Sequence, residues 1–267
     1  MAKLVLAVGV PHGPGLPEQV SQAPGQLPAE ALMTRVRGYM EEAAPDVIIE
    51  IASDHFTNFF YDNLPAFCLG LIDEAEGPAE TYCLMPHSVI KGHMPLAEEL
   101  LRFALRSNFD LAVASELRLD HSILVPLHFL TPSMDIPVVP LYVNGFAAPL
   151  PSARRCQALG RTIARFLKQY SPDTRVALLA SGVFSLEVGG PQVGWTDMEW
   201  VQTVSDLLTR GDYRTLARRA TPQRMAAAGN VSGELLNWIT MTGALSDVRP
   251  LFVETDGGSG YAVWKLD

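Results

Sequence analysis

Cationic charge and long apolar runs are scarce in this sequence of 267 residues, and each shortage excludes a class of protein. Lys and Arg number 20 against 29 Asp and Glu, which gives a formal net charge of −9. No cluster of Lys and Arg stands out along the sequence, so a surface that binds nucleic-acid phosphates is not expected. No uninterrupted run of 18 apolar residues occurs either, so we expect no segment that spans a membrane.

Cysteine is also rare, with only Cys68, Cys83 and Cys156, which have no CxxC spacing. An odd number of isolated cysteines disfavours both a zinc site and a disulfide framework, and indicates reduced thiols. The apolar N-terminus lacks a small-x-small cleavage site and runs directly into Pro11-His12-Gly13, which is more typical of a first strand than of a signal peptide. We therefore predict a cytoplasmic protein.

Apolar residues make up 48% of the chain and charged residues only 18%, which indicates a sizeable core and excludes a largely disordered protein. Short aliphatic runs alternate with longer amphipathic segments, a pattern that predicts the α/β class. We expect one domain over residues 1–267, with a mixed central sheet flanked by helices and an active site at the carboxyl ends of the strands. The Pro- and Gly-rich segment 11–28 is predicted to be a long surface loop.

The expected strands are Lys3–Val10, Asp46–Ser53, Ala66–Leu71, Asp110–Ser115, Pro137–Val143 and Arg175–Ala180, with Tyr261–Lys265 as a final edge strand. The expected helices are Ala29–Ala43, Pro95–Ser107, Ala153–Tyr170, Thr196–Leu208, Tyr213–Ala220 and Ser232–Thr242.

Three of the six histidines follow predicted strands: His12, His55 and His121. Ligands of open α/β sheets bind outside the carboxyl ends of the strands, where these histidines are expected to meet. A single histidine after a strand is more often a turn residue, and three together shift the balance toward a metal site or an acid/base site without deciding it. His87 and His93 are expected on a loop, either as surface residues or as part of a mobile cover.

A mononuclear metal site that stays open to substrate needs a third anchor, typically a carboxylate. Glu234 is a candidate because small and capping residues precede it and an apolar helix follows it. A glutamate in the first turn of a helix usually interacts with the helix dipole, so this residue alone does not distinguish a ligand from a cap.

An ordered series of motifs along nearly the whole chain resembles the class III extradiol ring-cleavage dioxygenases of the protocatechuate 4,5-dioxygenase β-subunit type. The motifs are Val10-Pro11-His12, Ala52-Ser53-Asp54-His55, Leu119-Asp120-His121-Ser122, Ser181-Gly182-Val183-Phe184-Ser185, Ser232-Gly233-Glu234-Leu235 and Gly243-Ala244-Leu245-Ser246-Asp247. Each motif is weak alone, whereas their order and spacing together are specific.

The resemblance implies that His12, His55 and Glu234 hold one Fe(II) as a facial triad, which leaves positions open for a substrate and O₂. A redox metal suits this chemistry, because triplet O₂ does not react readily with a closed-shell aromatic ring. His121 matches a family histidine that lies beside the substrate and donates a hydrogen bond or a proton. Asp120 either orients that imidazole or serves only in a turn.

One position departs from the family pattern. Where the family has a histidine that acts as the catalytic base, this sequence has Leu186, preceded by Phe184 and Ser185, and we assign these three residues and Asp120 to substrate binding. Leucine cannot transfer protons. Either the substrate needs no base there, or Glu187 or another group replaces it, or the chain is a non-catalytic subunit that supports a homologous active chain.

The resemblance favours an enzyme that cleaves a catechol-like or aminophenol-like ring with O₂, because a non-catalytic subunit has no reason to keep all three iron ligands. It also implies a lid over the iron that this chain is too short to supply. We therefore expect either a homodimer or a complex with a small lid-forming subunit.

Overall fold

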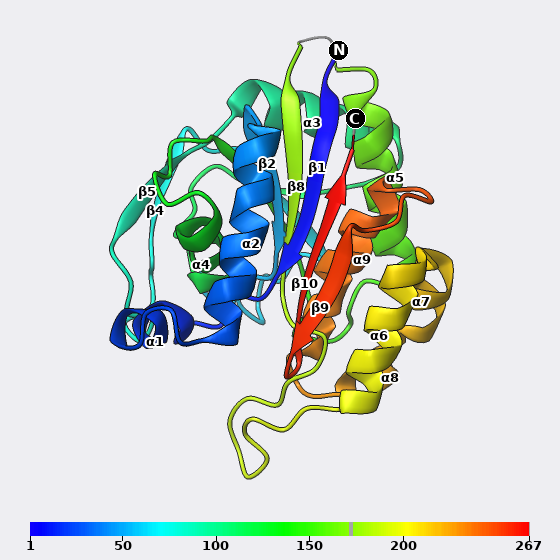
Figure 1. Ribbon diagram of the computed structural model, residues 1–267. Helices are drawn as coiled ribbons and strands as arrows, with labels where there is room; N and C mark the ends of the chain where they lie inside the picture. The colour runs from blue at the N-terminus through cyan, green and yellow to red at the C-terminus, as the bar shows by residue number, and fades with distance from the viewer. Residues whose placement is uncertain (171–172, 267) are drawn as a thin grey trace.

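The computed structural model describes residues 1–170 and 173–266, and it contains one α/β domain built on an eight-stranded mixed sheet (Figure 1). This confirms the predicted fold class. The strand order is β6-β3-β7-β2-β8-β1-β10-β9, and β4 and β5 form a separate hairpin. The strands are β1 (Lys3–Val10), β2 (Val47–Ala52), β3 (Phe67–Gly70), β4 (Glu74–Gly77), β5 (Ser88–Lys91), β6 (Ala112–Ala114), β7 (Val138–Val143), β8 (Arg175–Ser181), β9 (Phe252–Asp256) and β10 (Ser259–Lys265).

The centre of the sheet consists of four parallel strands, β7, β2, β8 and β1. Their carboxyl ends all lie at one edge of the sheet. Strand β3 is antiparallel to β7, and β6 is parallel to β3, so these two strands run in the opposite direction. On the other side, β10 pairs antiparallel with β1 and with β9.

Strand β2 shows why the central strands form. All six of its residues are buried, and their side chains alternate between two cores on opposite faces of the sheet. Ile49 and Ile51 lie in one core, and Ile48 and Ala52 in the other. A strand covered on both faces is typically apolar along its whole length, and β2 follows this pattern except at the buried Glu50.

Helices cover both faces of the sheet, with α2 and α4 on one face and α3, α5 and α9 on the other (Figure 1). No helix in the described ranges is both long and apolar enough to cross a membrane. The helices are α1 (Leu16–Gln22), α2 (Pro28–Ala43), α3 (Met94–Arg106), α4 (His121–Leu130), α5 (Ala153–Leu167), α6 (Met198–Arg210), α7 (Tyr213–Arg219), α8 (Pro222–Ala226) and α9 (Leu235–Ala244), with a 3₁₀ turn, η1 (Ser232–Glu234), before α9.

Several elements differ from the sequence-based expectation. The segment 11–28 is not only a loop, because it contains α1, and β10 is not an edge strand, because β9 lies outside it. Helix α4 escaped prediction because its sequence, HSILVPLHFL, has no polar face and contains Pro126. A helix that is buried nearly all round shows no amphipathic period by which it could be recognised.

Candidate metal centre

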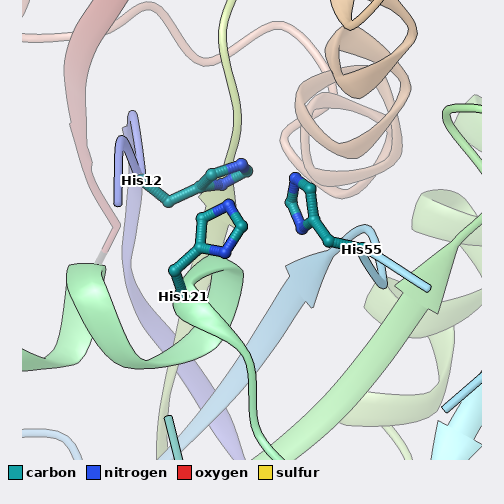
Figure 2. Close-up of side chains that lie close together, drawn as sticks. All are labelled: His12, His55 and His121. Atoms are coloured by element: carbon teal, nitrogen blue, oxygen red, sulfur yellow. The ribbon is translucent and has the colours of Figure 1, made fainter. Parts of the chain in front are cut away.

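Three histidines that lie far apart in the sequence point toward one another at the carboxyl edge of the parallel strands (Figure 2). His12 lies just beyond β1, His55 just beyond β2, and His121 is the first residue of α4. One ring nitrogen from each lies within 4.8 Å of the other two, and this group could hold a metal ion. The three histidines therefore lie together at this edge of the sheet, as predicted.

His121 reaches this cluster by a route that differs from the predicted one. We expected it at the carboxyl end of the strand over 110–115, but the corresponding β6 is antiparallel to the central strands. The chain returns to the site through residues 115–120, where Leu119 donates its backbone N–H to Glu76. His121 is therefore placed by the N-terminus of α4 and by the β4–β5 hairpin, and not by the end of a strand.

His12 is held by a hydroxyl group that fixes its tautomer. Ser181 Oγ donates its only proton to the carbonyl oxygen of Ser122 at 2.7 Å, so it can only accept from His12 Nδ1 at 2.8 Å. This network assigns a proton to His12 Nδ1 and leaves Nε2 with a free lone pair when the ring is neutral. His12 Nε2 lies 3.1 Å from Glu234 Oε1.

The carboxylate of Asp120 holds His55 at the corresponding ring nitrogen, Nδ1. Its Oδ2 accepts from the backbone N–H of His55 at 2.7 Å and contacts Nδ1 at 3.3 Å, and His55 Nε2 lies 3.3 Å from Glu234 Oε1. Burial lowers the pKa of His55, but the two carboxylates outweigh it and raise the pKa to about 10. Asp120 and Glu234 thus favour positive charge at this place.

The third histidine has a carboxylate that the sequence analysis missed. Glu80 Oε1 lies 2.5 Å from His121 Nδ1 and accepts from the backbone N–H of His121 at 3.1 Å. Burial and the neighbouring imidazoles of His55 and His12 lower the pKa of His121 despite this contact. No motif marked Glu80, because it lies in the loop after β4 and approaches His121 only through the tertiary fold.

The Nδ1 atom of each of the three rings therefore contacts a hydroxyl group or a carboxylate. Second partners of this kind fix the orientation of metal-binding histidines and make them better ligands. Each ring is left with Nε2 as the nitrogen that could bind a metal ion.

Glu234 completes the cluster and does not cap its helix. It is the last residue of η1, makes no capping hydrogen bond with its side chain, and is 2% exposed. Its Oε2 accepts from the backbone N–H of Val183 at 2.9 Å, just beyond β8. Burial raises the pKa of this carboxyl group, but His12 and His55 outweigh it and hold the pKa well below its usual range.

A glycine makes room for this carboxylate. Gly182 has φ +147°, and a Cβ atom there would lie 2.7 Å from the Cβ of Glu234. The lack of a side chain at Gly182 thus allows η1 to approach the end of β8.

The donor atoms fit a small divalent metal ion. Neighbouring ligands of a metal with bonds of about 2.1 Å lie about 3 Å apart, close to the 3.1 and 3.3 Å that separate Glu234 Oε1 from the two Nε2 atoms. A lone pair of neutral His12 also faces a carboxylate oxygen, so the contact is favourable only with a cation, either a proton or a metal ion, between them.

The other residues predicted to bind substrate are held by neighbouring protein groups. The carboxylate of Asp120 holds His55 and not the neighbouring His121 imidazole considered in the sequence, because its Oδ2 contacts His55 while its Oδ1 caps α4 at the N–H of Ser122. Ser185 Oγ donates to the carbonyl of Ala228 and accepts from the N–H of Asp197. Phe184 is fully buried against Trp238. Their substrate roles stay predictions.

Leu186 and Glu187 lie in the loop after β8, next to the turn that carries Glu234. The N–H of Leu186 donates to Ser232 Oγ at 3.3 Å, and the Leu186 side chain is half-buried. The carboxylate of Glu187 accepts from the N–H of Asn230 at 2.8 Å, so it already has a partner away from the three histidines.

The two remaining histidines considered in the sequence lie outside the cluster. His87 is exposed on the loop before β5, as expected for a surface residue. His93 is instead the N-cap of α3, where Nδ1 accepts from the N–H of Leu96 at 3.2 Å.

Aromatic side chains lie beside the histidines. The ring of Phe146 is 4.7 Å from that of His55, and the ring of Tyr82 is 6.0 Å from that of His121. Tyr61 stacks on Phe56 and is itself 82% exposed. Flat apolar surfaces of this kind suit a planar ring.

Comparison with known proteins identifies the class to which this fold and site belong. The profile of the family described as the catalytic LigB subunit of aromatic ring-opening dioxygenase matches residues 6–261. The chain therefore belongs to the LigB family of aromatic ring-opening dioxygenases, and the resemblance inferred from the motifs is confirmed.

Individual relatives agree with this assignment. A 2,3-dihydroxyphenylpropionate/2,3-dihydroxicinnamic acid 1,2-dioxygenase of Klebsiella pneumoniae (strain 342) is 34% identical over 182 residues, which are 64% of this chain and 55% of that protein. The protein of the same description from Escherichia coli K12 is 33% identical over the same shares. The chain thus spans about half the length of these curated relatives.

The fold has a close counterpart among solved structures. The crystal structure of the uncharacterized protein JW3007 from Escherichia coli K12 superposes with a TM-score of 0.62 and 14% identity, covering 98% of this chain and all of that one. At this identity the likeness concerns the fold alone.

Proposed function

We propose that the protein is an Fe(II)-dependent extradiol-type dioxygenase that cleaves a catechol-like or aminophenol-like ring with O₂. Membership of the LigB family supports this proposal, as do the catechol-type substrates named for the relatives. The observation that carries it is the arrangement of the donor atoms, in which the anchored rings of His12 and His55 both present Nε2 to one oxygen of Glu234.

The donor set supports Fe(II) as the metal. Two imidazoles and one carboxylate form the facial triad typical of non-haem Fe(II) oxygenases, with further positions left for ligands. Bound iron would hold the substrate and O₂ side by side and pass electrons between them. The protein supplies the rest of the chemistry, namely binding, orientation and proton transfer.

His121 and Glu80 are suited to hold a proton. With its Nδ1 proton facing Glu80, neutral His121 presents the Nε2 lone pair, and Glu80 would stabilise the imidazolium formed when a substrate proton arrives. We propose that this pair takes over part of the role of the missing base at Leu186. Glu187 is a weaker candidate, because its carboxylate is bound to the backbone of Asn230.

The absence of a base at Leu186 also bears on the substrate. A ring hydroxyl that is already acidic, for example next to a carboxyl or nitro group, loses its proton on metal binding alone. We therefore propose a preference for acidic catechols or aminophenols.

Metal analysis after anaerobic reconstitution with Fe(II), followed by an oxygen-electrode screen of catechols and aminophenols, tests the proposed function. We expect about one iron per chain and O₂ uptake coupled to the yellow colour of a ring-opened product. A chain that binds iron but consumes no O₂ with any ring substrate, alone or mixed with a homologous active chain, would contradict catalysis. Activity that appears only in the partner when the two are mixed would support a non-catalytic subunit.

We further propose that the working form is an oligomer, either a homodimer or a complex with a small subunit that covers the iron. Exposed aromatic side chains near the site support a covering partner. Tyr82, whose ring lies 6.0 Å from that of His121, is 59% exposed, and Tyr61, which stacks on Phe56, is 82% exposed. Light scattering after size-exclusion chromatography should show more than one chain. A monomer at micromolar concentration with full activity would contradict this expectation.

The cytoplasmic location stays a prediction. Cys68, Cys83 and Cys156 are all free and buried, which is compatible with a reducing compartment.

A further inference from the structure

Positive charge is concentrated on two helices of this acidic protein. Helices α5 and α7 carry seven of the 20 Lys and Arg residues and none of the 29 Asp and Glu residues. The two helices are separated by 45 residues of sequence and pack against each other (Figure 1). The sequence alone shows no cluster, because the arginines are spread along two helices and meet only in the fold.

A cavity of about 950 Å³ opens between these helices and the C-terminal end of α9. Four arginines line it, Arg154 and Arg161 from α5 and Arg214 and Arg218 from α7. Arg154 and Arg161 are seven residues apart, two helical turns, and so lie on one face of α5.

None of these four guanidinium groups forms an ion pair with a carboxylate of the described residues. Elsewhere on the surface the chain does pair its arginines, as Arg37 with Glu41, Arg102 with Glu98 and Arg210 with Asp206. Neighbouring arginines without ion-pair partners generate a positive potential, which a concave surface focuses.

Two acidic residues also line the cavity, Asp212 and Asp247. The carboxylate of Asp212 is engaged as the N-cap of α7, where it accepts from the N–H of Thr215 at 3.1 Å. Four arginines against two aspartates leave the cavity with excess positive charge in a protein whose net charge is −9.

We propose that this cavity binds a small polyanion that carries phosphate or several carboxylate groups. Guanidinium groups present planar, paired N–H donors that match both kinds of oxyanion, so the recognition chemistry is shared. The volume falls within the range of small-molecule sites, about 300–1,000 Å³. The hydroxyl group of Ser246, which also lines the cavity, supplies a neutral donor.

The cavity is distinct from the histidine cluster. Helix α9 begins next to Glu234 and ends at the cavity, where Thr242 and Gly243 line the wall. Ten residues of helix span about 15 Å. The proposal therefore does not depend on the proposed function, and an anion bound here would not compete with a ligand at the histidines.

Isothermal titration of the intact chain with inorganic phosphate and, separately, with citrate tests the proposal at an ionic strength held constant with chloride. We expect saturable binding of at least one of the two, and the tighter ligand identifies the phosphate or the polycarboxylate class. The variant Arg214→Gln/Arg218→Gln should weaken binding by about tenfold or more, because it removes two charge-assisted contacts.

Arg219→Gln is the matched control, because Arg219 is an exposed arginine on the same helix that does not line the cavity. It should change the affinity by less than about twofold, since surface charges at a distance are screened. Should the double variant fail to fold, Arg161→Gln on α5 provides the same test. No saturable binding of either anion, or equal weakening by Arg219→Gln and by the cavity variant, would overturn the proposal.

Discussion

Replacing Glu234 with alanine is expected to remove most of the Fe(II) from the protein, whereas replacing His121 with alanine should leave the iron in place. Glu234 Oε1 lies within 3.3 Å of the Nε2 atoms of both His12 and His55, and it supplies the only negative charge of the proposed triad. His121 contributes an imidazole whose proposed role is proton transfer. Iron content per chain, measured after anaerobic reconstitution and desalting, distinguishes the two variants.

The same measurement tests the alternative ligand set. The three histidines alone also form a group that could hold a metal. If His12, His55 and His121 were the ligands, His121→Ala would lose iron and Glu234→Ala would retain it. His12→Ala and His55→Ala are expected to lose iron under both hypotheses, and circular dichroism of each variant verifies that the fold is intact.

Asp120→Asn provides a graded control for this prediction. Asparagine can still accept from the N–H of Ser122 and cap α4, but it no longer provides the carboxylate that holds His55 at Nδ1. Loss of such a second partner typically costs about 10–100-fold in metal affinity. An unchanged affinity would show that Asp120 does not act through His55.

Replacing Leu186 with histidine is expected to increase the rate with simple catechols, by no more than the factor of about 10²–10⁴ that a general base usually contributes, because His121 and Glu80 already supply part of that role. The backbone at this position is held from both sides, because the N–H of Leu186 donates to Ser232 Oγ and its carbonyl accepts from the N–H of Val231. The Cα atom of a histidine introduced there would therefore be fixed next to η1. The ratio of kcat/KM for catechol to that for a carboxyl- or nitro-substituted catechol should rise.

Glu187→Gln serves as the companion variant. The carboxylate of Glu187 accepts from the N–H of Asn230, and glutamine can accept the same hydrogen bond, so turnover should change little. The account of proton handling fails if Glu187→Gln abolishes turnover while Leu186→His has no effect on any catechol. In that case Glu187 would be the group that replaces the missing base.

The sequence predicted the central strands and most of the helices because their signals are local. Strand β2 is apolar at every position except Glu50, and α5 shows a clear amphipathic pattern that places Cys156, Leu159 and Ile163 in the core. A strand buried on both faces of a sheet shows a short apolar run, and a helix buried on one face shows apolar residues three and four positions apart. Both patterns can be recognised from neighbouring residues. Helix α4 and strand β9 lacked such a pattern and were missed, the first because it is buried nearly all round and the second because it is a partly exposed edge strand.

His12 and His55 could be placed at the site from the sequence, because each follows a parallel strand by a few residues and such strands end at one edge of the sheet. Glu234 depended on the resemblance to a family, since a ligand and a helix cap carry the same local signature. His121 was placed there by the strand rule, although the strand before it, β6, runs in the opposite direction. The sequence also determined the departure at Leu186, because that is a matter of residue identity alone.

Only the tertiary structure decided which groups hold these side chains. Glu80, Asp120 and Ser181 reach the three imidazoles from a loop, a helix cap and a strand end, and Glu80 and Ser181 lie 41 and 169 residues from their partners. The four arginines of the cavity likewise meet through the packing of α5 on α7. A hydrogen bond or an ion pair depends on distances of a few ångströms, and contacts between distant segments leave no period in the sequence from which they could be inferred.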